Sequence, residues 1–374
     1  MIRLVKRYML RLGSVRRTGR VADGKGMRAM EWRKRPTMED VAKAAGVSKA
    51  TVSRVLAGIE SGSTPATAER VRQTALRLGY VVNSIAASLR SRQSFTIGLL
   101  LADVANPFFG GIASGVESRL SQTGYSVILG NTGNSLERER SLVRVLVEKQ
   151  IDGLIAATSA ASAEHFREAQ QRGVQVVLVD SDVPGLEADT VTIDNRATAE
   201  AVVGHLLEQG HRRIAIVTGP MDATFDRHRL EGYTRALGRH GIAYDEALVL
   251  RADLLAEGGE RAVDRLLELS PRPTALFATN NMMTQGVLVG LRRAGLRIPD
   301  EISVVGFDDQ DWYALCHPPL SAVANPAYEI GHVAADRLLT RLAGRGERIE
   351  QPVEHLILDA PLVLRASTAP PPHG

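Results

Sequence analysis

Two basic side chains, Lys49 and Arg54, fall on the outer face of a short helix that the sequence predicts, together with Ala50 and Ser53. Lysine and arginine can donate hydrogen bonds to the O6 and N7 atoms of guanine, whereas alanine offers only an apolar contact, such as one to a thymine methyl group. The chemistry that these residue types indicate is recognition of double-stranded DNA.

The segment 37–56 predicts the two helices and the tight turn that would position these side chains. Thr37 caps the first helix, with Asp40 three residues later as a variant of the capping box, and Gly46 supplies a left-handed turn residue. Ser48 caps the second helix, and the apolar side chains of both helices fall on their inner faces. This pattern is typical of a helix-turn-helix, whose second helix enters the DNA major groove N-terminus first. The alternative interpretation is an ordinary helical hairpin in a larger core.

A third helix is predicted from Thr64 and Pro65 to a stop at Gly79, and its apolar face would close the small core of this module. Residues 1–35 contain 12 Lys or Arg against 2 Asp or Glu, whereas residues 96–374 contain 26 against 36. A basic N-terminal part joined to an acidic body indicates a polyanionic partner for the first part only.

Residues 1–35 show no steady periodicity and have two interpretations. They could form a disordered basic arm that adds contacts to DNA phosphates. Alternatively, translation starts at Met27 or Met30, and the segment is a mis-assigned extension.

From Thr96 onward, short apolar runs alternate with helical stretches of ten to sixteen residues. This alternation is typical of parallel sheets covered by helices on both faces, and the number of runs predicts two doubly wound lobes. Such sheets bind ligands beyond the carboxyl ends of their strands. Asn106, Phe108 and Phe109 follow the first run. The two rings could stack on the C–H face of a sugar, with Asn106 hydrogen-bonding nearby, or they could pack the core of the lobe.

Residues 41–54, Val-Ala-Lys-Ala-Ala-Gly-Val-Ser-Lys-Ala-Thr-Val-Ser-Arg, resemble the headpiece signature of the LacI/GalR family of bacterial transcription regulators. The resemblance extends from residue 37 to about residue 366. It implies an α/β protein with an all-α helix-turn-helix headpiece (36–82), a hinge helix and linker (83–94) and a periplasmic-binding-protein-like type I core (95–374). Lobe 1 of that core would span about 95–195 and 326–350, and lobe 2 about 196–323 and 354–366.

The resemblance also assigns roles on DNA. Lys49, Ala50 and Arg54 match the positions that read bases, and the expected phosphate contacts or helix caps are Thr37, Ser48, Thr51 and Ser53. In the hinge the implied minor-groove residues are Ser84, Ala87 and Leu89. Leu89 would wedge between the central base pairs, as apolar side chains do when they kink DNA. A short linker helix with an exposed leucine is the alternative, and Val82 stands where the family often has proline.

By the same resemblance, effector-binding residues follow the strands of both lobes. They are Asn106, Phe108, Phe109, Asp180, Arg229, Asn280, Asp308 and Asn325, with Phe225 and Trp312 as weaker stacking candidates. Carboxylates, amides and one guanidinium suit a neutral polyol. Arg229 could instead pair with Asp308 as scaffolding. Asn325 and Ser181 differ from the glutamine and arginine that are frequent at these positions, which argues against ribose itself.

The sequence therefore predicts a cytoplasmic regulator, most simply a homodimeric repressor that binds a pseudo-palindromic operator and responds to a sugar-like effector. A purine, sugar acid or phosphorylated metabolite is the alternative effector, and a solute-binding receptor or an enzyme is the alternative class. No phosphate-binding loop, nucleophile elbow, metal-ligand spacing or long apolar run occurs, and the single cysteine, Cys316, has no partner for a disulfide. We expect no cofactor, no metal and no membrane contact.

Overall fold

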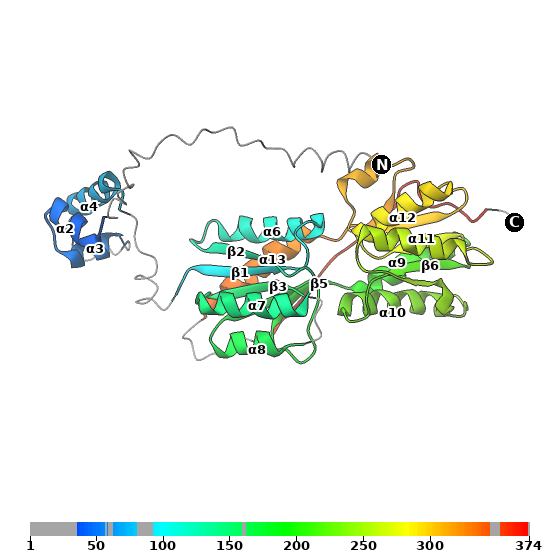
Figure 1. The fold of residues 1–374 in the computed structure, drawn as a ribbon, viewed down its shortest axis with the longest axis horizontal. Coiled ribbons are helices and arrows are strands. Elements are labelled where there is room, and N and C mark those ends of the chain that lie inside the picture. The colour runs from blue at the N-terminus through cyan, green and yellow to red at the C-terminus, as the bar shows by residue number, and fades with distance from the viewer. Residues whose placement is uncertain are drawn as a thin grey trace, which may run out of the picture. The chain divides into compact units, whose positions relative to one another are not determined.

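The computed structural model describes residues 36–56, 58, 63–80, 93–158, 162–344 and 352–372. The chain separates into two compact units, one up to residue 83 and one from residue 84 onward (Figure 1). The three hinge residues singled out above, Ser84, Ala87 and Leu89, lie outside the described residues, and so does the extension 1–35.

The N-terminal unit consists of three helices, α2 (Met38–Ala45), α3 (Lys49–Leu56) and α4 (Pro65–Leu78). The capping box predicted at Thr37 and Asp40 is present, and Gly46 ends α2 in the left-handed conformation. Buried side chains from all three helices, including Val41, Val52 and Val71, form one small cluster. The third helix therefore completes a core that two short helices could not bury alone.

Two six-stranded sheets form the second unit. The first sheet has the order β11-β5-β4-β3-β1-β2 and is parallel throughout. The second has the order β12-β10-β9-β8-β6-β7, in which only β12 runs antiparallel. The strands of the first are β1 (Thr96–Leu101), β2 (Ser126–Asn131), β3 (Gly153–Ala157), β4 (Gln175–Val179), β5 (Asp189–Ile193) and β11 (His355–Leu358). Those of the second are β6 (Ile214–Thr218), β7 (Val249–Arg251), β8 (Ala275–Ala278), β9 (Ser303–Phe307), β10 (Ser321–Val323) and β12 (Leu362–Val363).

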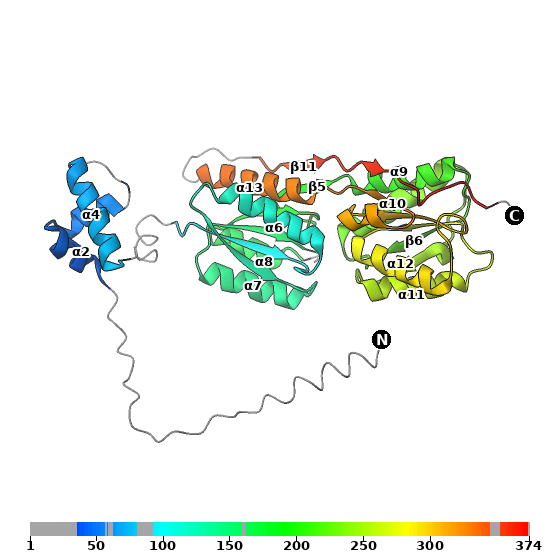
Figure 2. The same cartoon turned by 90° about the horizontal axis from the view of Figure 1, so that it is seen from above.

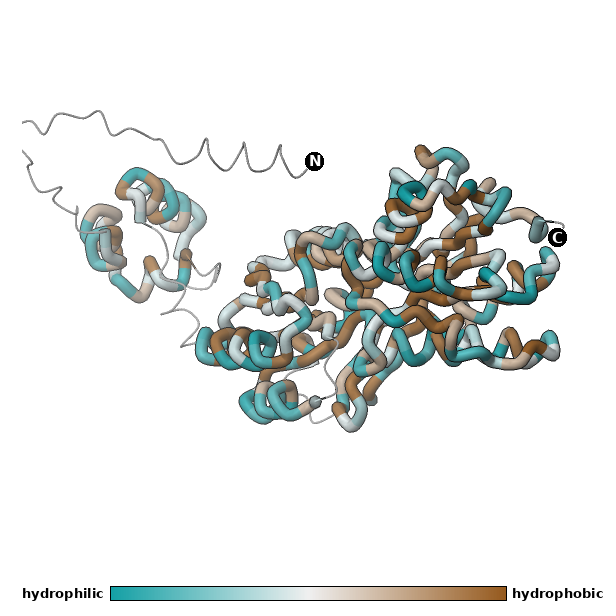
Figure 3. The backbone as a smooth tube through the Cα atoms, turned by 45° about the vertical axis from the view of Figure 1, so that its right-hand side comes forward, coloured by the Kyte–Doolittle hydropathy of each residue, from teal (hydrophilic) through white to brown (hydrophobic). Residues whose placement is uncertain are grey.

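Helices cover both faces of each sheet (Figures 1 and 2). In lobe 1 they are α6 (Pro107–Leu120), α7 (Leu136–Glu148), α8 (Glu164–Gln171) and α13 (Ala327–Ala343). In lobe 2 they are α9 (Asn195–Glu208), α10 (Thr224–Arg239), α11 (Ala256–Leu267) and α12 (Asn281–Ala294), with the short 3₁₀ helices η1 (Glu246–Leu248) and η2 (Asp311–Leu315). The tube in Figure 3 is hydrophobic along the central strands and mixed along the helices, as expected for sheets buried on both faces. The two-lobed α/β core predicted from the sequence is confirmed.

The prediction of which lobe the C-terminal segment joins was wrong in one part. Residues 354–366 were assigned to lobe 2, yet β11 pairs with β5 in the sheet of lobe 1, and only β12 joins lobe 2. The hydroxyl of Thr190 and Nδ1 of His355 lie 2.7 Å apart across this pair. A four-residue strand at a sheet edge has no pattern of its own that tells which open edge it will complete, so only the tertiary fold decides.

Asp189 at the start of β5 ties the returning chain to lobe 1. Its side chain is fully buried and accepts hydrogen bonds from Nε of Arg337 at 2.7 Å and Nε of Arg341 at 2.8 Å. The backbone N–H of Glu354 donates to the same carboxylate at 2.9 Å. Burial alone would raise the pKa of Asp189, but these donors outweigh it and lower the pKa below its usual value.

Helices α6 and α13, far apart in the sequence, pack backbone to backbone at Gly115. A methyl group there would overlap the carbonyl oxygen of Tyr328 on α13. We expect Gly115→Ala to lower the free energy of unfolding of the core by about 1–3 kcal/mol, because overpacked positions force the backbone to shift. Gly110→Ala on the same helix is the matched control, since nothing lies within 4 Å of an added methyl group. Chemical denaturation of both variants makes the comparison, and equal stabilities would contradict the packing argument.

Candidate functional site

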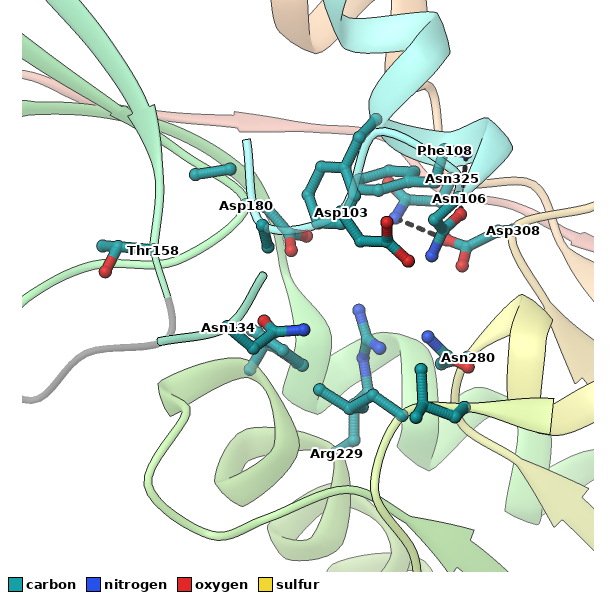
Figure 4. Close-up of a pocket in the computed structure, with 16 residues that line it drawn as sticks. Asp103, Asn106, Phe108, Asn134, Thr158, Asp180, Arg229, Asn280, Asp308 and Asn325 are labelled. Carbon is teal, nitrogen blue, oxygen red and sulfur yellow. Dashed lines mark hydrogen bonds between the residues drawn. The ribbon is translucent and has the colours of Figure 1, made fainter. Parts of the chain in front are cut away.

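A cavity of about 610 Å³, counting the space that opens to solvent, lies between the two lobes beyond the carboxyl ends of their strands. We call it the interlobe pocket (Figure 4). Its walls come from both lobes and from the crossing segment after β10. The lining residues are Ala102, Asp103, Asn106, Phe108, Phe109, Asn134, Ala157, Thr158, Asp180, Phe225, Arg229, Leu254, Leu255, Asn280, Asp308 and Asn325.

All eight main effector candidates from the sequence line this pocket, and so does the weaker candidate Phe225. Trp312 does not. It lies on η2, edge-on to Tyr313 at 4.5 Å between ring centroids, and packs against the apolar core of lobe 2. An aromatic residue in apolar surroundings is usually a core residue, and Trp312 follows that rule.

Asn106 and Phe108 are fixed by the start of α6. The side chain of Asn106 caps the helix by accepting a hydrogen bond from the backbone N–H of Phe108 at 2.9 Å. Phe108 belongs to the buried core of the lobe and still reaches the pocket wall, edge-on to Phe109 at 5.2 Å between centroids. The two interpretations of these rings are therefore compatible, because each ring has a packed side and a side toward the pocket.

Asp180 and Asp308 take equivalent positions after a strand in each lobe. Both have positive backbone φ angles, 67° after β4 and 66° after β9. A non-glycine residue in this region is strained, and such residues concentrate at functional sites. The sharp turn brings each carboxylate into the pocket (Figure 4).

Among the described residues, Arg229 on α10 is the one cationic residue that lines the pocket. Its Nε donates to Oδ1 of Asn195 at 2.8 Å, and an Nη donates to the carbonyl oxygen of Thr279 at 2.5 Å. The guanidinium carbon lies 3.8 Å from the centroid of the Phe307 ring. Among the described residues Arg229 forms no ion pair with Asp308. That carboxylate accepts instead from the side chain of Asn325 at 2.9 Å.

Burial dominates the acidity of the carboxyl groups around Arg229. It raises the pKa of Asp180 to about 6 and that of Asp226, directly behind the pocket, to about 6 as well. It also raises the pKa of Asp308. The positive charge of Arg229 opposes the rise in all three, because a nearby cation favours the ionised form of a carboxyl group.

The lobes touch directly beside the pocket. Nδ2 of Asn281 at the start of α12 donates to Oδ1 of Asn106 in lobe 1 at 2.7 Å, and both residues are buried. The backbone N–H of Asn281 donates to Asp308 at 3.2 Å. Elsewhere along the cleft the hydroxyl of Thr224 donates to the carbonyl of Asp182 at 3.3 Å. The pocket residues are thus connected to the contact that holds the lobes together.

Sequence reasoning did not select several residues of the pocket. Three of them are polar, Asp103, Asn134 and Thr158, and each follows a strand of lobe 1 within a few residues. The rule that ligands bind beyond strand ends would have found them if applied to every strand. Leu254 and Leu255 follow the short strand β7, which no apolar run in the sequence had marked.

The N-terminal unit presents the second candidate surface. Lys49, Ala50 and Arg54 are exposed on α3. The side chain of Ser48 caps the helix by accepting from the backbone N–H of Thr51 at 3.1 Å. A short helix with a free basic face and a capped N-terminus is the geometry that a recognition helix needs.

Comparison with known proteins matches each of the two units to a protein family. The profile "Bacterial regulatory proteins, lacI family" matches residues 37–83, and that of the "Periplasmic binding protein-like domain" matches residues 203–368. The HTH-type transcriptional repressor CytR of Escherichia coli (strain K12) is 35% identical over 346 residues, which are 91% of this chain and 99% of the relative.

The chain belongs to the lacI family of bacterial regulatory proteins.

Other family members agree with this assignment. The HTH-type transcriptional regulator PtxS of Pseudomonas aeruginosa is 36% identical over 90% of this chain and 97% of its own length. A lac repressor dimer solved on its operator with the anti-inducer ONPF matches 90% of this chain and 100% of its own at a TM-score of 0.78 and 28% identity. The CelR–cellobiose complex matches 89% and 100% at a TM-score of 0.68 and 33% identity.

This lacI-family chain is accordingly a DNA-binding transcriptional regulator, and its relatives are regulators rather than enzymes. Within the described ranges no helix is long and apolar enough to cross a membrane. The same ranges contain no group of three or more histidine, cysteine or acidic residues that could hold a metal ion.

Because the pKa of Asp226 is raised, replacing this residue is expected to increase the stability of the folded protein by an amount that depends on pH. The pKa of this group is about 6 in the folded protein and near 3.8 when unfolded, so its contribution to stability is complete below the lower value and is lost as the pH rises through 6. Asp226→Asn stays neutral at every pH. We expect the thermal midpoint of the variant, relative to the unmodified chain, to rise between about pH 5 and pH 7.5.

The quantity to measure is the difference in thermal midpoint between the variant and the unmodified chain at each pH. Burial lowers the pKa values of three histidines, His205, His211 and His228, so their contribution makes the folded protein more stable as the pH rises. Because both chains contain these histidines, their contribution cancels in the difference. Asp222→Asn, at an exposed aspartate four residues earlier, is the control. A difference for Asp226→Asn that is constant with pH would show that Asp226 ionises normally.

Proposed function

We propose that this regulator is a repressor of carbohydrate-uptake or catabolism genes, controlled by a small neutral sugar bound in the interlobe pocket. The observation that carries the proposal is the composition of the pocket wall, which combines three aspartates, one arginine, four asparagines and three phenylalanines. Carboxylates and amides accept from hydroxyl groups, and the guanidinium donates to them. Phe108 offers the apolar face that a sugar ring needs.

One buried acceptor supports a hydroxyl-bearing ligand in particular. Oδ1 of Asn325 is buried and has no hydrogen-bond partner among the described residues, while its Nδ2 is committed to Asp308. A buried acceptor without a donor costs free energy, so it favours a ligand that supplies one. A sugar hydroxyl meets this requirement.

The charge of the pocket argues against an anionic effector. In the part of the pocket that the structure describes, Asp103, Asp180 and Asp308 outnumber the cation Arg229, and Asp226 is a further acidic group close to Arg229. A phosphate or carboxylate would enter an acidic cleft with only one guanidinium to receive it. The relatives solved with cellobiose, and with ribose in the case of an Enterococcus faecium family member, support a neutral carbohydrate.

Control of DNA binding follows from where the effector would sit. Lobe 1 supplies Asp103, Asn106 and Asp180 to the pocket, and lobe 2 supplies Arg229 and Asn280. A ligand that contacts both lobes binds one relative arrangement better than another and so shifts the population between them. In a homodimer this shift would be passed to the DNA-binding units as a coupling free energy.

On the DNA side, we propose that two copies of the N-terminal unit read a pseudo-palindromic operator. Lys49 and Arg54 would donate to guanine, Ala50 would contact a thymine methyl group, and the phosphate contacts would come from Thr37, Ser48, Thr51 and Ser53. The lac repressor dimer solved on its operator supports this arrangement, because symmetric half-sites match a symmetric dimer.

A thermal-shift screen of the full chain against neutral sugars, sugar acids, sugar phosphates and purines tests the class of effector. A ligand that binds only the folded protein raises stability by about 2.7 kcal/mol at a hundredfold excess over its Kd. Neutral sugars are expected to give the shift. Shifts confined to phosphates, acids or purines would overturn the proposed effector class.

Asp308→Ala is expected to abolish the response to the effector while leaving operator affinity within twofold, because the carboxylate lines the pocket and lies in the core unit. Titration of a fluorescent operator with protein, with and without the effector found in the screen, makes the measurement. Asp311→Ala, at an exposed aspartate on η2, is the control. A variant that still responds with unchanged midpoint would remove Asp308 from the site.

Arg54→Ala is expected to cost about 1–3 kcal/mol of operator binding and to relax preference at one base pair in each half-site. Arg77→Ala removes the same charge from the exposed surface of α4 and serves as the control. Competition assays with operators altered at single base pairs separate the two variants. If Arg54→Ala weakened binding equally for every base, the residue would contact phosphate rather than a base.

A further inference from the structure

Asn195 lies where the chain passes from one lobe to the other. Ile193 ends β5 in the sheet of lobe 1, and Asn195 is the first residue of α9 in lobe 2. The side chain of Asn195 is buried, and it is not part of the wall of the interlobe pocket. Asn195 therefore belongs to the crossing segment between the lobes rather than to the surface that a ligand would touch.

The side-chain amide of Asn195 uses both of its ends. Oδ1 accepts from Nε of Arg229 at 2.8 Å, and Nδ2 donates to the carbonyl oxygen of Ile193 at 3.4 Å. The other acceptor of the guanidinium is the carbonyl oxygen of Thr279, at 2.5 Å from an Nη. Both acceptors are neutral, so they fix the guanidinium in place without cancelling its charge.

Three carboxyl groups lie around the same guanidinium without pairing with it. Asp180 follows β4, Asp308 follows β9, and Asp226 lies on α10 three residues before Arg229. Burial raises the pKa of each of the three, and the charge of Arg229 opposes the rise. Yet the hydrogen bonds of Arg229 within the described residues go to an amide and a carbonyl group. The neutral acceptors therefore hold the cation away from these acidic neighbours.

Asp226 is the carboxyl group most ready to accept from Arg229. It is fully buried, and its Oδ1 accepts from the backbone N–H of Gly219 at 3.1 Å. Its Oδ2 is buried and has no hydrogen-bond partner among the described residues. Residues three apart on a helix are neighbours on its surface, and a buried acceptor without a donor costs free energy. A guanidinium released from Asn195 would therefore pair with Asp226.

The remaining N–H groups of Arg229 face the pocket. Its second Nη atom donates to none of the residues that the structure describes. In Figure 4 the guanidinium points into the space bordered by Asp180, Asn280 and Asp308. These donors stay available to a ligand only while the guanidinium keeps this position.

We propose that Asn195 is a positioning residue of the interlobe pocket, whose neutral amide keeps Arg229 out of an ion pair with Asp226 and available to the effector. The inference rests on the proposed function in one respect, that Arg229 receives an effector. The position of the guanidinium itself can be tested without any ligand. Because Asn195 belongs to the crossing segment, a change in the arrangement of the lobes that moves this segment also moves the acceptor that holds Arg229.

The pH dependence of stability tests the proposal in the effector-free full chain. A carboxyl group whose pKa is higher in the folded than in the unfolded state makes the protein less stable as the pH rises. In Asn195→Ala the guanidinium pairs with Asp226, so the pKa of that group falls below its value of about 6 and this loss becomes smaller. We expect the thermal midpoint of Asn195→Ala, minus that of the unmodified chain, to rise by about 2 °C or more between about pH 5 and pH 7.5.

Ala199→Gly is the matched control for this measurement. It is a neutral change at a buried position of α9, next to Gly232 on α10, and it alters no hydrogen bond of Arg229. Its difference from the unmodified chain is expected to be constant with pH. His228, which follows Arg227 on α10 and has a pKa lowered chiefly by burial, is present in every chain, so its contribution cancels.

Asn195→Ser also lacks the amide oxygen, and it repeats the measurement if Asn195→Ala does not unfold cooperatively. A difference for the Asn195 variants that stays constant with pH, or that falls, would overturn the proposal. Such a result would mean that Arg229 keeps its place without Asn195, or that it moves away from Asp226.

Calorimetric titration with neutral sugars tests the consequence for binding. The probes are ribose, glucose, galactose and cellobiose. A probe that binds the unmodified chain is expected to bind Asn195→Ala about tenfold more weakly, because a guanidinium paired with a carboxylate has fewer donors left for hydroxyl groups. Ala199→Gly should keep the affinity within about twofold, since it leaves Arg229 in place.

The outcomes separate this inference from the proposed function. Equal affinities of Asn195→Ala and the unmodified chain for a sugar that binds would overturn the positioning role and leave the neutral-sugar effector standing. If none of the sugars binds the unmodified chain, the proposed effector class fails, and the pH measurement alone decides whether Asn195 positions Arg229.

Discussion

The buried guanidinium of Arg229 makes the interactions on which the interlobe pocket depends. A buried cation must be held by several partners, and here they are the side chain of Asn195, the carbonyl of Thr279 and the ring of Phe307. In return, its charge offsets the cost of burying Asp180, Asp226 and Asp308 in the same small volume. Without that cation the pKa values of all three carboxyl groups would rise further.

The two lobes share this site because of how parallel sheets are built. Every strand that leads into the pocket ends there, so polar residues placed just after the strands of both sheets converge on one space. The direct hydrogen bond between Asn106 and Asn281 then makes the relative position of the lobes part of the site. The effector that we propose for the pocket would act on the arrangement of the lobes as well as on individual side chains.

The N-terminal unit is constructed on a different principle. Its core is too small to hold the helices by burial alone, so local signals carry much of the specification: the capping box of Thr37 and Asp40, the left-handed Gly46 and the cap at Ser48. These signals leave the outer face of α3 free for polar and basic residues. The inner faces and caps of these helices are constrained by stability, and the outer face of α3 by recognition. Both sets of residues lie in one short segment, so this segment identifies the family.

The sequence by itself determined the features that depend on local periodicity and capping. The helices of the N-terminal unit, the alternation of strands and helices and the family could all be derived from it, and Phe108, Arg229 and Asp308 could be selected because strand ends and motifs mark them. Only the tertiary structure decided that β11 completes lobe 1, that Trp312 packs in a core, and that Asp103, Asn134 and Thr158 line the pocket. Those outcomes depend on which distant segments meet across a sheet edge or a cleft. Such long-range pairing is set by the packing of the whole fold, which no local pattern of residues records.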